Sequence, residues 1–162
     1  MSENQFEGFN MRLAIVDMLP VIFFTITTIQ LGRYLDSSIF IIGAILCFIG
    51  GFCKVLWKVV LALKKKDLHF LFLALRLFMP PGFILMIVGF VLRLKAGAIG
   101  TLFTALLKFP NLMFAIIGLL GLIAMGYMAK KLNANDSKDN WKEQLVNTFA
   151  QAAFMVWILL SI

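Results

Sequence analysis

Residues 38–63 read SIFIIGAILCFIGGFCKVLWKVVLAL, and this apolar run decides the class of fold. A helix over the run is about 39 Å long at about 1.5 Å per residue, which exceeds the roughly 30 Å hydrocarbon core of a bilayer. Lys54 and Lys58 are its charged residues, and polar turns flank it at residues 33–36 and 64–67. The run therefore predicts a transmembrane helix.

The remainder of the chain has the same character. It contains 162 residues, of which 62% are hydrophobic, and its mean hydropathy is +0.97. Soluble domains have roughly 45–50% apolar residues, so this chain is expected to use lipid as its solvent. The segments of about ten alternating residues that build a membrane β-barrel are missing. We predict an all-α, polytopic transmembrane helix bundle of about five spans, in a single domain over residues 1–162.

The apolar stretches place the expected helices along the chain. Spans are predicted at about residues 13–31, 38–63, 68–94, 110–129 and 143–162, with a short interfacial helix over residues 101–109. Asp36, Ser37 or Ser38 can cap the second span by accepting its free N–H groups, and Asp67 is expected to cap the third.

The third segment is interrupted at Pro80-Pro81-Gly82, which leaves two arrangements open. The segment can cross the membrane, or it can turn back as a re-entrant hairpin. We favour the straight crossing, because a lipid-facing irregular turn at mid-membrane leaves backbone groups unpaired. The prolines free the carbonyls of Arg76 and Leu77, and transporters use broken helices of this kind to bind substrates or ions. Proline kinks are also ordinary features of membrane helices, so the break is a suggestive signal only.

The basic residues predict an orientation. With five crossings, the N-terminal side carries Arg12, Lys54, Lys58, Lys64, Lys65, Lys66, Arg76, Lys130, Lys131, Lys138 and Lys142, and the other carries Arg33, Arg93, Lys95 and Lys108. This eleven-to-four split predicts a multi-pass protein of the plasma (inner) membrane, with a cytoplasmic N-terminus and an external C-terminus. If the third segment is a hairpin, ten basic residues lie on one side and five on the other. The two distributions are too similar to decide between a crossing and a hairpin. Because the cations gather at the ends of apolar segments, the net charge of +7 indicates contact with headgroups and no nucleic-acid partner.

One sector of the second span carries small and basic residues together. At about 100° per residue, this sector holds Gly43, Cys47, Gly50, Gly51, Lys54 and Lys58. Small residues allow another helix to approach closely, so the sector is expected to face protein. Lys58 is near enough to the helix end for its amine to snorkel to the headgroups, which is the reading we favour for it. Lys54 lies about 15 Å from Lys64 along the helix axis, deeper in the membrane. For Lys54 we therefore give equal weight to a snorkelling side chain and to one that points into the bundle.

Ionisable groups at membrane depth usually face the protein interior and have a function. The candidate substrate-binding residues are Asp17, Lys54, Lys58, Arg76, Glu143, Asn147 and Gln151. Glu143, Asn147 and Gln151 are spaced i, i+4, i+8 and form one stripe, either as interhelical hydrogen-bonding groups or as the wall of a polar cavity. The five charged candidates are expected in the cytoplasmic half of the bilayer. They predict either a layer of structural salt bridges, which we favour, or a vestibule that attracts an anion.

The remaining small residues predict contacts between helices. Ala115, Gly118, Gly121, Gly126 and Ala129 lie broadly on one side of the fourth span. They permit a close helix contact, either within the chain or between two copies of it. Cys47 and Cys53 point about 240° apart on a helix, so neither a disulfide between them nor a shared metal is expected.

Known catalytic motifs are missing from the sequence. It contains no phosphate loop, no H-E-x-x-H zinc motif and no G-x-S-x-G nucleophile elbow, so we expect no cofactor, no metal site and no catalytic residues. The leading hypothesis is a small membrane transport protein: a carrier, a channel or a membrane subunit of a transport complex, with a cytoplasm-facing polar pocket. Its expected partners are the lipid bilayer, a small anionic ligand or lipid headgroup, and either further copies of the chain or a membrane partner subunit. The alternatives are a structural or accessory membrane protein without a pocket, and a lipid-modifying enzyme using Asp17, Glu143 or His69.

Overall fold

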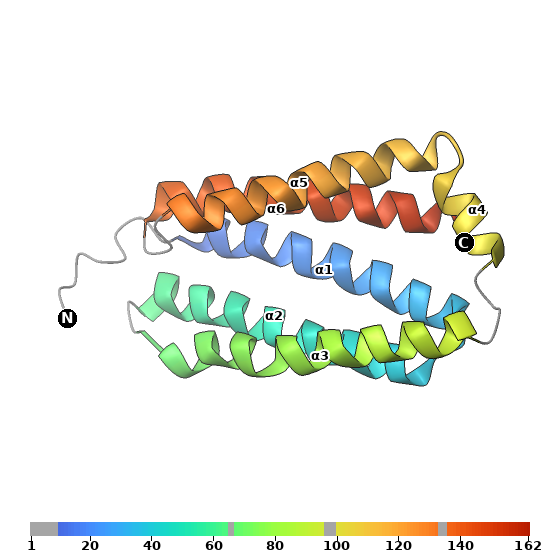
Figure 1. The fold of residues 1–162 in the computed structure, drawn as a ribbon. Coiled ribbons are helices and arrows are strands. Elements are labelled where there is room, and N and C mark those ends of the chain that lie inside the picture. Colours follow the sequence, from blue (N-terminus) through green and yellow to red (C-terminus); the bar gives the residue numbers. More distant parts are fainter. Residues whose placement is uncertain (1–9, 65–66, 96–99, 133–135) are drawn as a thin grey trace.

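The computed structural model describes residues 10–64, 67–95, 100–132 and 136–162, and these residues are helical apart from short turns (Figure 1). The elements are α1 (Met11–Tyr34), α2 (Ser38–Lys64), α3 (His69–Lys95), α4 (Gly100–Leu107), α5 (Asn111–Lys131) and α6 (Ser137–Leu159). The predicted all-α helix bundle is therefore confirmed.

Four helices in the described part of the chain are long and apolar enough to cross a membrane, namely α1, α2, α3 and α5. Helix α6 has 23 residues and runs beside them, but it is more polar and is not among the four. Its first two turns contain the stretch Ser137-Lys138-Asp139-Asn140-Trp141-Lys142-Glu143-Gln144. The chain is thus a membrane helix bundle, and a fifth crossing by α6 stays a prediction.

The long helices lie in an open row of neighbours. Helix α1 is in the middle, between the antiparallel pair α2/α3 and the antiparallel pair α5/α6 (Figure 1). Extensive contacts join α3 to α2, α2 to α1, α1 to α6 and α6 to α5, while α4 contacts α5. Helices α3 and α6 are not extensively packed on each other in the described residues. Helices α3 and α6 are therefore connected mainly through α2 and α1.

Glycines bring α2 and α3 into close contact. A Cβ atom on Gly82 would lie 2.6 Å from the Cys47 Sγ atom and 2.8 Å from the Gly43 carbonyl oxygen. A Cβ on Gly50 would lie 3.3 Å from the Phe78 Cβ atom, also on α3. Gly51 instead faces Val21 of α1. The prediction that this sector of the second span faces protein is confirmed.

Helix α3 continues through Pro80-Pro81-Gly82 as one helix. The re-entrant hairpin and the predicted break in the third segment are thus wrong, and α3 is long enough to cross the membrane as a single helix. Pro80 and Pro81 are on the exposed side of α3, whereas Gly82 is buried against α2. Membrane helices tolerate the loss of backbone donors at proline when neighbouring helices support them.

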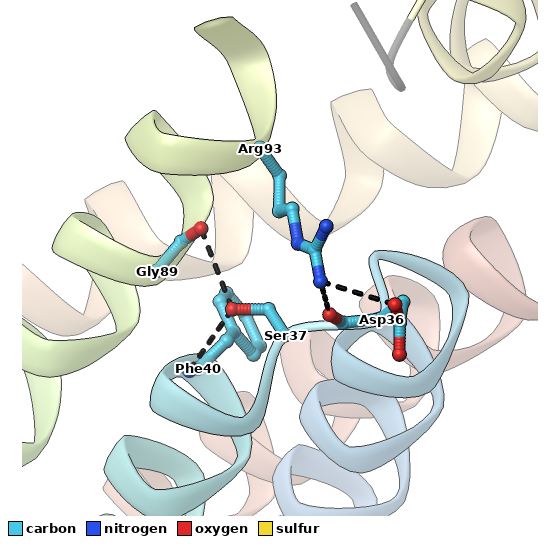
Figure 2. A network of polar contacts seen from close by, with 5 residues as sticks. All are labelled: Asp36, Ser37, Phe40, Gly89 and Arg93. Carbon is cyan, nitrogen blue, oxygen red and sulfur yellow. Dashed lines mark hydrogen bonds and ion pairs between the residues drawn. The ribbon is translucent and has the colours of Figure 1, made fainter. Parts of the chain in front are cut away.

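The turn between α1 and α2 is fastened to α3 (Figure 2). Asp36 has a left-handed backbone with φ of 48°, a conformation in which aspartate is enriched. The Arg93 Nη2 atom donates to the Asp36 carbonyl oxygen and lies 3.1 Å from its Oδ2 atom. The Ser37 Oγ atom accepts from the Phe40 N–H at 3.3 Å and donates to the Gly89 carbonyl at 3.5 Å. Ser37 is therefore the residue, of the three candidates, that caps α2.

The small residues of α5 meet α6 within the same chain. A Cβ on Gly121 would lie 2.5 Å from the Ala150 Cβ atom, and Gly118 is covered by the Phe154 ring. Gly126 has nothing within 4 Å of the corresponding position, and Ala115 is half-buried. The side chain of Ala129 lies outside the described residues. The close contact predicted for the fourth span is therefore internal where Gly118 and Gly121 make it.

Gly82→Ala should lower the thermal stability of the protein in detergent, because the added methyl group collides with α2 backbone and the Cys47 sulfur. Overpacking of this kind costs about 1–3 kcal/mol. The matched control is Gly126→Ala, where the methyl group enters open space. Equal melting temperatures for the two variants would show that α2 and α3 are not in this close contact.

Candidate functional site

The most deeply buried charges form one ion pair between α1 and α2. The Lys58 Nζ atom lies 3.2 Å from the Asp17 Oδ2 atom, and the two side chains are 2% and 4% exposed. The reading favoured for Lys58, that its amine snorkels to the headgroups, is therefore wrong. Asp17 lies on the neighbouring helix at the same depth, and an opposite charge there stabilises the amine more directly than the distant headgroup region.

A cavity of about 210 Å³ lies beside this ion pair. Its wall comes from α1, α2, α3 and α6, through Asp17, Pro20, Val21, Phe24, Cys47, Gly51, Lys54, Leu75, Met79, Phe83, Asn147 and Gln151. Four of the residues singled out in the sequence, Asp17, Lys54, Asn147 and Gln151, thus line one space. Most of the remaining wall is apolar, as is usual for sites that bind small organic molecules.

The wall contains the acid Asp17 and the cation Lys54. The Lys54 side chain is half-buried, and it makes no hydrogen bond or ion pair within the described part of the chain. The Asp17 carboxylate is held by Lys58, which lies one helical turn from Lys54 on the same face of α2. Lys54 is therefore a cation of the cavity wall without an ion-pair partner among the described residues.

Three other candidates are not part of the cavity wall. Arg76 is exposed on α3, with its guanidinium carbon 5.4 Å from the centre of the Phe72 ring. Glu143 is half-buried and acts electrostatically on Lys58, but it does not line the cavity. His69 is exposed and lies 4.0 Å from the Asp67 carboxylate. The acids and bases proposed for a lipid-modifying enzyme thus do not converge on this space.

An apolar cluster separates the cavity from the end of the row where α1 begins. It consists of Leu13, Trp57 and Leu61, with Leu71, Phe72 and Trp141 packed against them. Each of these residues is closer to that end of its helix than the cavity residues of the same helix. We call this group the Trp57 cluster.

Asp67, in the turn between α2 and α3, is bonded to the Trp57 cluster. Asp67 was expected to cap the third segment. Instead its Oδ1 atom accepts a hydrogen bond of 2.7 Å from the Trp57 Nε1 atom, and α3 begins at His69. The carboxylate therefore holds the indole ring in place within the Trp57 cluster.

A second apolar cluster lies on the other side of the cavity, toward the α1–α2 turn. It contains Leu35, Phe40, Ala44, Cys47, Met86 and Leu102, with Phe24, Ile29, Leu31, Phe90 and Leu106 around them. The cavity is thus bounded by apolar layers toward both ends of the helices. Helices α3 and α6 both line it but are not extensively packed on each other.

Gln144 is a buried polar residue that the sequence analysis missed. Its side chain is 1% exposed, and neither its Oε1 nor its Nε2 atom has a hydrogen-bond partner among the described residues. The stripe chosen from the sequence was Glu143, Asn147 and Gln151. Gln144, Asn147 and Gln151 are spaced i, i+3, i+7, and this spacing follows the buried face of α6. The same spacing, applied to the sequence, identifies Gln144 as a member of that face.

The described residues contain no group of three or more His, Cys, Asp or Glu side chains that could hold a metal ion. Cys47 and Cys53 are both free thiols. Comparisons with protein-family models, with curated proteins and with solved structures found no match. The ion pair and the cavity are therefore the features of the described residues that bear on function.

Asp17→Asn should destabilise the protein by about 3–5 kcal/mol, because it leaves the Lys58 ammonium buried without its counter-charge. Lys58→Met should be tolerated better when Asp17→Asn is also present, since the double variant buries no charge at this position. The measurement is a double-mutant cycle of unfolding free energies in mixed micelles. Strictly additive effects would mean that the two side chains do not interact.

Gln144→Leu should stabilise the protein by about 1–3 kcal/mol, because it removes two buried polar atoms that have no partner. The control is Leu145→Gln, which changes a neighbouring residue that is 46% exposed and points away from the helix contacts. Melting temperatures in detergent give the comparison. A loss of stability in Gln144→Leu would show that the amide has a partner after all.

Proposed function

We propose that this chain is a small membrane transport protein, a carrier, a channel or a membrane subunit of a transport complex, and that its solute binds in the cavity beside Asp17 and Lys58. The observation that carries the proposal is that Lys54, Asn147 and Gln151 line one cavity between α1, α2, α3 and α6. The cost of placing Lys54 there, about 2.5–3.5 kcal/mol on insertion scales, is not offset by an ion pair.

A structural salt-bridge layer accounts for only part of the polar content. It explains Asp17 and Lys58, which neutralise each other at 3.2 Å. It does not explain Lys54, which has no such partner, or the amides of Asn147 and Gln151 on the opposite wall. A solute with a negative charge and hydrogen-bond acceptors satisfies these three groups together. This complementarity favours a binding site over a purely structural role.

Transport also requires a route to water, and the Trp57 cluster is the proposed gate. The distribution of basic residues favours a cytoplasmic position for the end where α1 begins, in a plasma (inner) membrane, with the C-terminus outside. The Trp57 cluster lies between that end and the cavity. Its members Phe72 and Trp141 belong to α3 and α6. Because these two helices are not extensively packed together, they can separate without disrupting a large interface.

The open row of helices is consistent with a larger assembly. Helices α3 and α5 each lie at one edge of the row, so further copies of the chain or a membrane partner subunit can pack beside them. If the cavity proves inaccessible, the better description is an accessory membrane protein that acts through these edges.

Cysteine labelling tests whether the cavity opens to the cytoplasmic side. In a variant carrying Cys47→Ala and Cys53→Ala, we expect Gln151→Cys to react with a membrane-impermeant thiosulfonate in inside-out vesicles and not in right-side-out vesicles. Phe149→Cys is the matched control: it is close to the same depth on α6 but is 71% exposed on the opposite side, where lipid is expected. Trp141→Ala, which opens the Trp57 cluster, should raise the labelling rate of Gln151→Cys several-fold.

Uptake of labelled acetate, succinate and phosphate into proteoliposomes supplies the functional measurement. Flux of any of these anions that Lys54→Gln reduces would support transport. If Gln151→Cys is unlabelled from both sides, with or without Trp141→Ala, and no anion is taken up, the transport proposal is wrong.

A further inference from the structure

The side of the cavity between α3 and α6 is called its free side, because extensive helix contacts do not close it. The Trp57 cluster bounds the cavity toward one end of the helices, and the cluster around Phe40 bounds it toward the other. In a bilayer, the free side is the one from which lipid can reach the cavity. The inference below depends on the proposed function only in taking this cavity as the binding site.

The wall is divided into a polar part and an apolar part. The polar part consists of Lys54 on α2, the amides of Asn147 and Gln151 on α6, and Asp17 on α1, whose carboxylate is paired with Lys58. Leu75, Met79 and Phe83 are spaced i, i+4, i+8 on one face of α3 and form the apolar part. The Phe83 ring is 43% exposed and meets the Phe24 ring edge to face at 6.0 Å, so it lies at the rim. A ligand that matches both parts is amphipathic.

The charged groups of the wall indicate the sign of the charge on the ligand. Asp17 is paired with Lys58, whereas Lys54 makes no ion pair among the described residues. A negative group on the ligand can pair with Lys54. The amide N–H groups of Asn147 and Gln151 can donate to the oxygens of a carboxylate or a phosphate. A cationic head is repelled by Lys54, and a neutral head with oxygen acceptors can bind the amides but leaves Lys54 without a counter-charge.

The volume of the cavity limits how much of the ligand it encloses. It measures about 210 Å³, which is somewhat larger than the roughly 150 Å³ of an engineered apolar cavity that holds benzene. A small anionic head and the first part of one hydrocarbon chain fill such a space. The rest of a longer chain has to leave by the free side, between α3 and α6, where the hydrocarbon of the bilayer accepts it.

We infer that the cavity binds a single-chain anionic amphiphile, with a carboxylate or phosphate head at Lys54, Asn147 and Gln151, and that the molecule enters from the bilayer between α3 and α6. The hydrocarbon chain then lies along Leu75, Met79 and Phe83. The ligand of the proposed transport protein is thus taken from the membrane and not from water.

Photo-crosslinking in phosphatidylcholine nanodiscs tests this inference. The probe is palmitate carrying a diazirine on its chain, and crosslinked peptides are identified by mass spectrometry. We expect crosslinks at Leu75, Met79 and Phe83 that excess octanoate or octyl phosphate suppresses and octyltrimethylammonium does not. Crosslinks on the outer face of α5, at Leu120 and Ile123, report contact with bulk lipid and should not respond to any competitor.

Lys54→Gln should weaken this competition by octanoate at least tenfold, because it removes the charge while keeping similar side-chain length. Lys64→Gln is the matched control, since Lys64 has the same charge on the same helix but is exposed at its end. If Lys54→Gln folds poorly, judged by its melting temperature, Gln151→Leu removes a donor from the opposite wall and should also weaken competition. Whichever of octanoate and octyl phosphate competes more strongly shows whether the head group of the ligand is a carboxylate or a phosphate.

The possible results test the binding of an amphiphile independently of the proposed transport function. Suppression by octanoate or octyl phosphate that is lost in Lys54→Gln supports the inference, whether or not the uptake assay shows flux. Suppression by inorganic phosphate as strong as by octyl phosphate overturns it, because the site then takes an anion without a chain, and the transport proposal is unaffected. Equal suppression by the cationic competitor, or crosslinks at α3 that no competitor changes, also overturns it.

Discussion

The ion pair between Asp17 and Lys58 is the constraint on which the centre of the molecule depends. A buried ammonium group in a membrane is tolerated when an opposite charge lies beside it, and here the two atoms are 3.2 Å apart. Because the pair joins α1 to α2, it sets the depth at which these helices meet. Asp17 also lines the neighbouring cavity, where Lys58 offsets its negative charge. Lys54, one turn away, is left as the cation of that space.

The arrangement of the helices then decides what the cavity can reach. A closed ring of helices would enclose it, but α3 and α6 belong to opposite halves of an open row and are not extensively packed together. Glycine contacts hold α3 on α2 and α5 on α6, so each half is a tight pair. Apolar clusters lie toward both ends of the cavity, so the side between α3 and α6 is the remaining route to it. The cavity is built from both halves, and neither half contains it alone.

Long apolar runs made the class of fold and the approximate bounds of the first five helices predictable, whereas α6 begins at Ser137, in the polar stretch before the predicted start at residue 143. The small residues of α2 were also correctly assigned to a protein-facing sector, because helical periodicity places them on one side. Local signals were weaker guides where a tertiary contact competed with them. Pro80 and Pro81 predicted a break, yet α3 is continuous and packs closely on α2 at Gly82. Asp67 was expected to cap α3, yet its carboxylate accepts from Trp57.

The sequence by itself determined that the chain is a helical membrane protein and that most of its intramembrane polar groups lie in one half of it. Hydropathy and helical spacing are properties of single segments, so they suffice for both conclusions. Only the tertiary structure decided that Asp17 belongs to Lys58, that Lys54, Asn147 and Gln151 share a cavity, and that Arg76 does not. These are relations between helices, and they depend on rotations and neighbours that no single segment encodes.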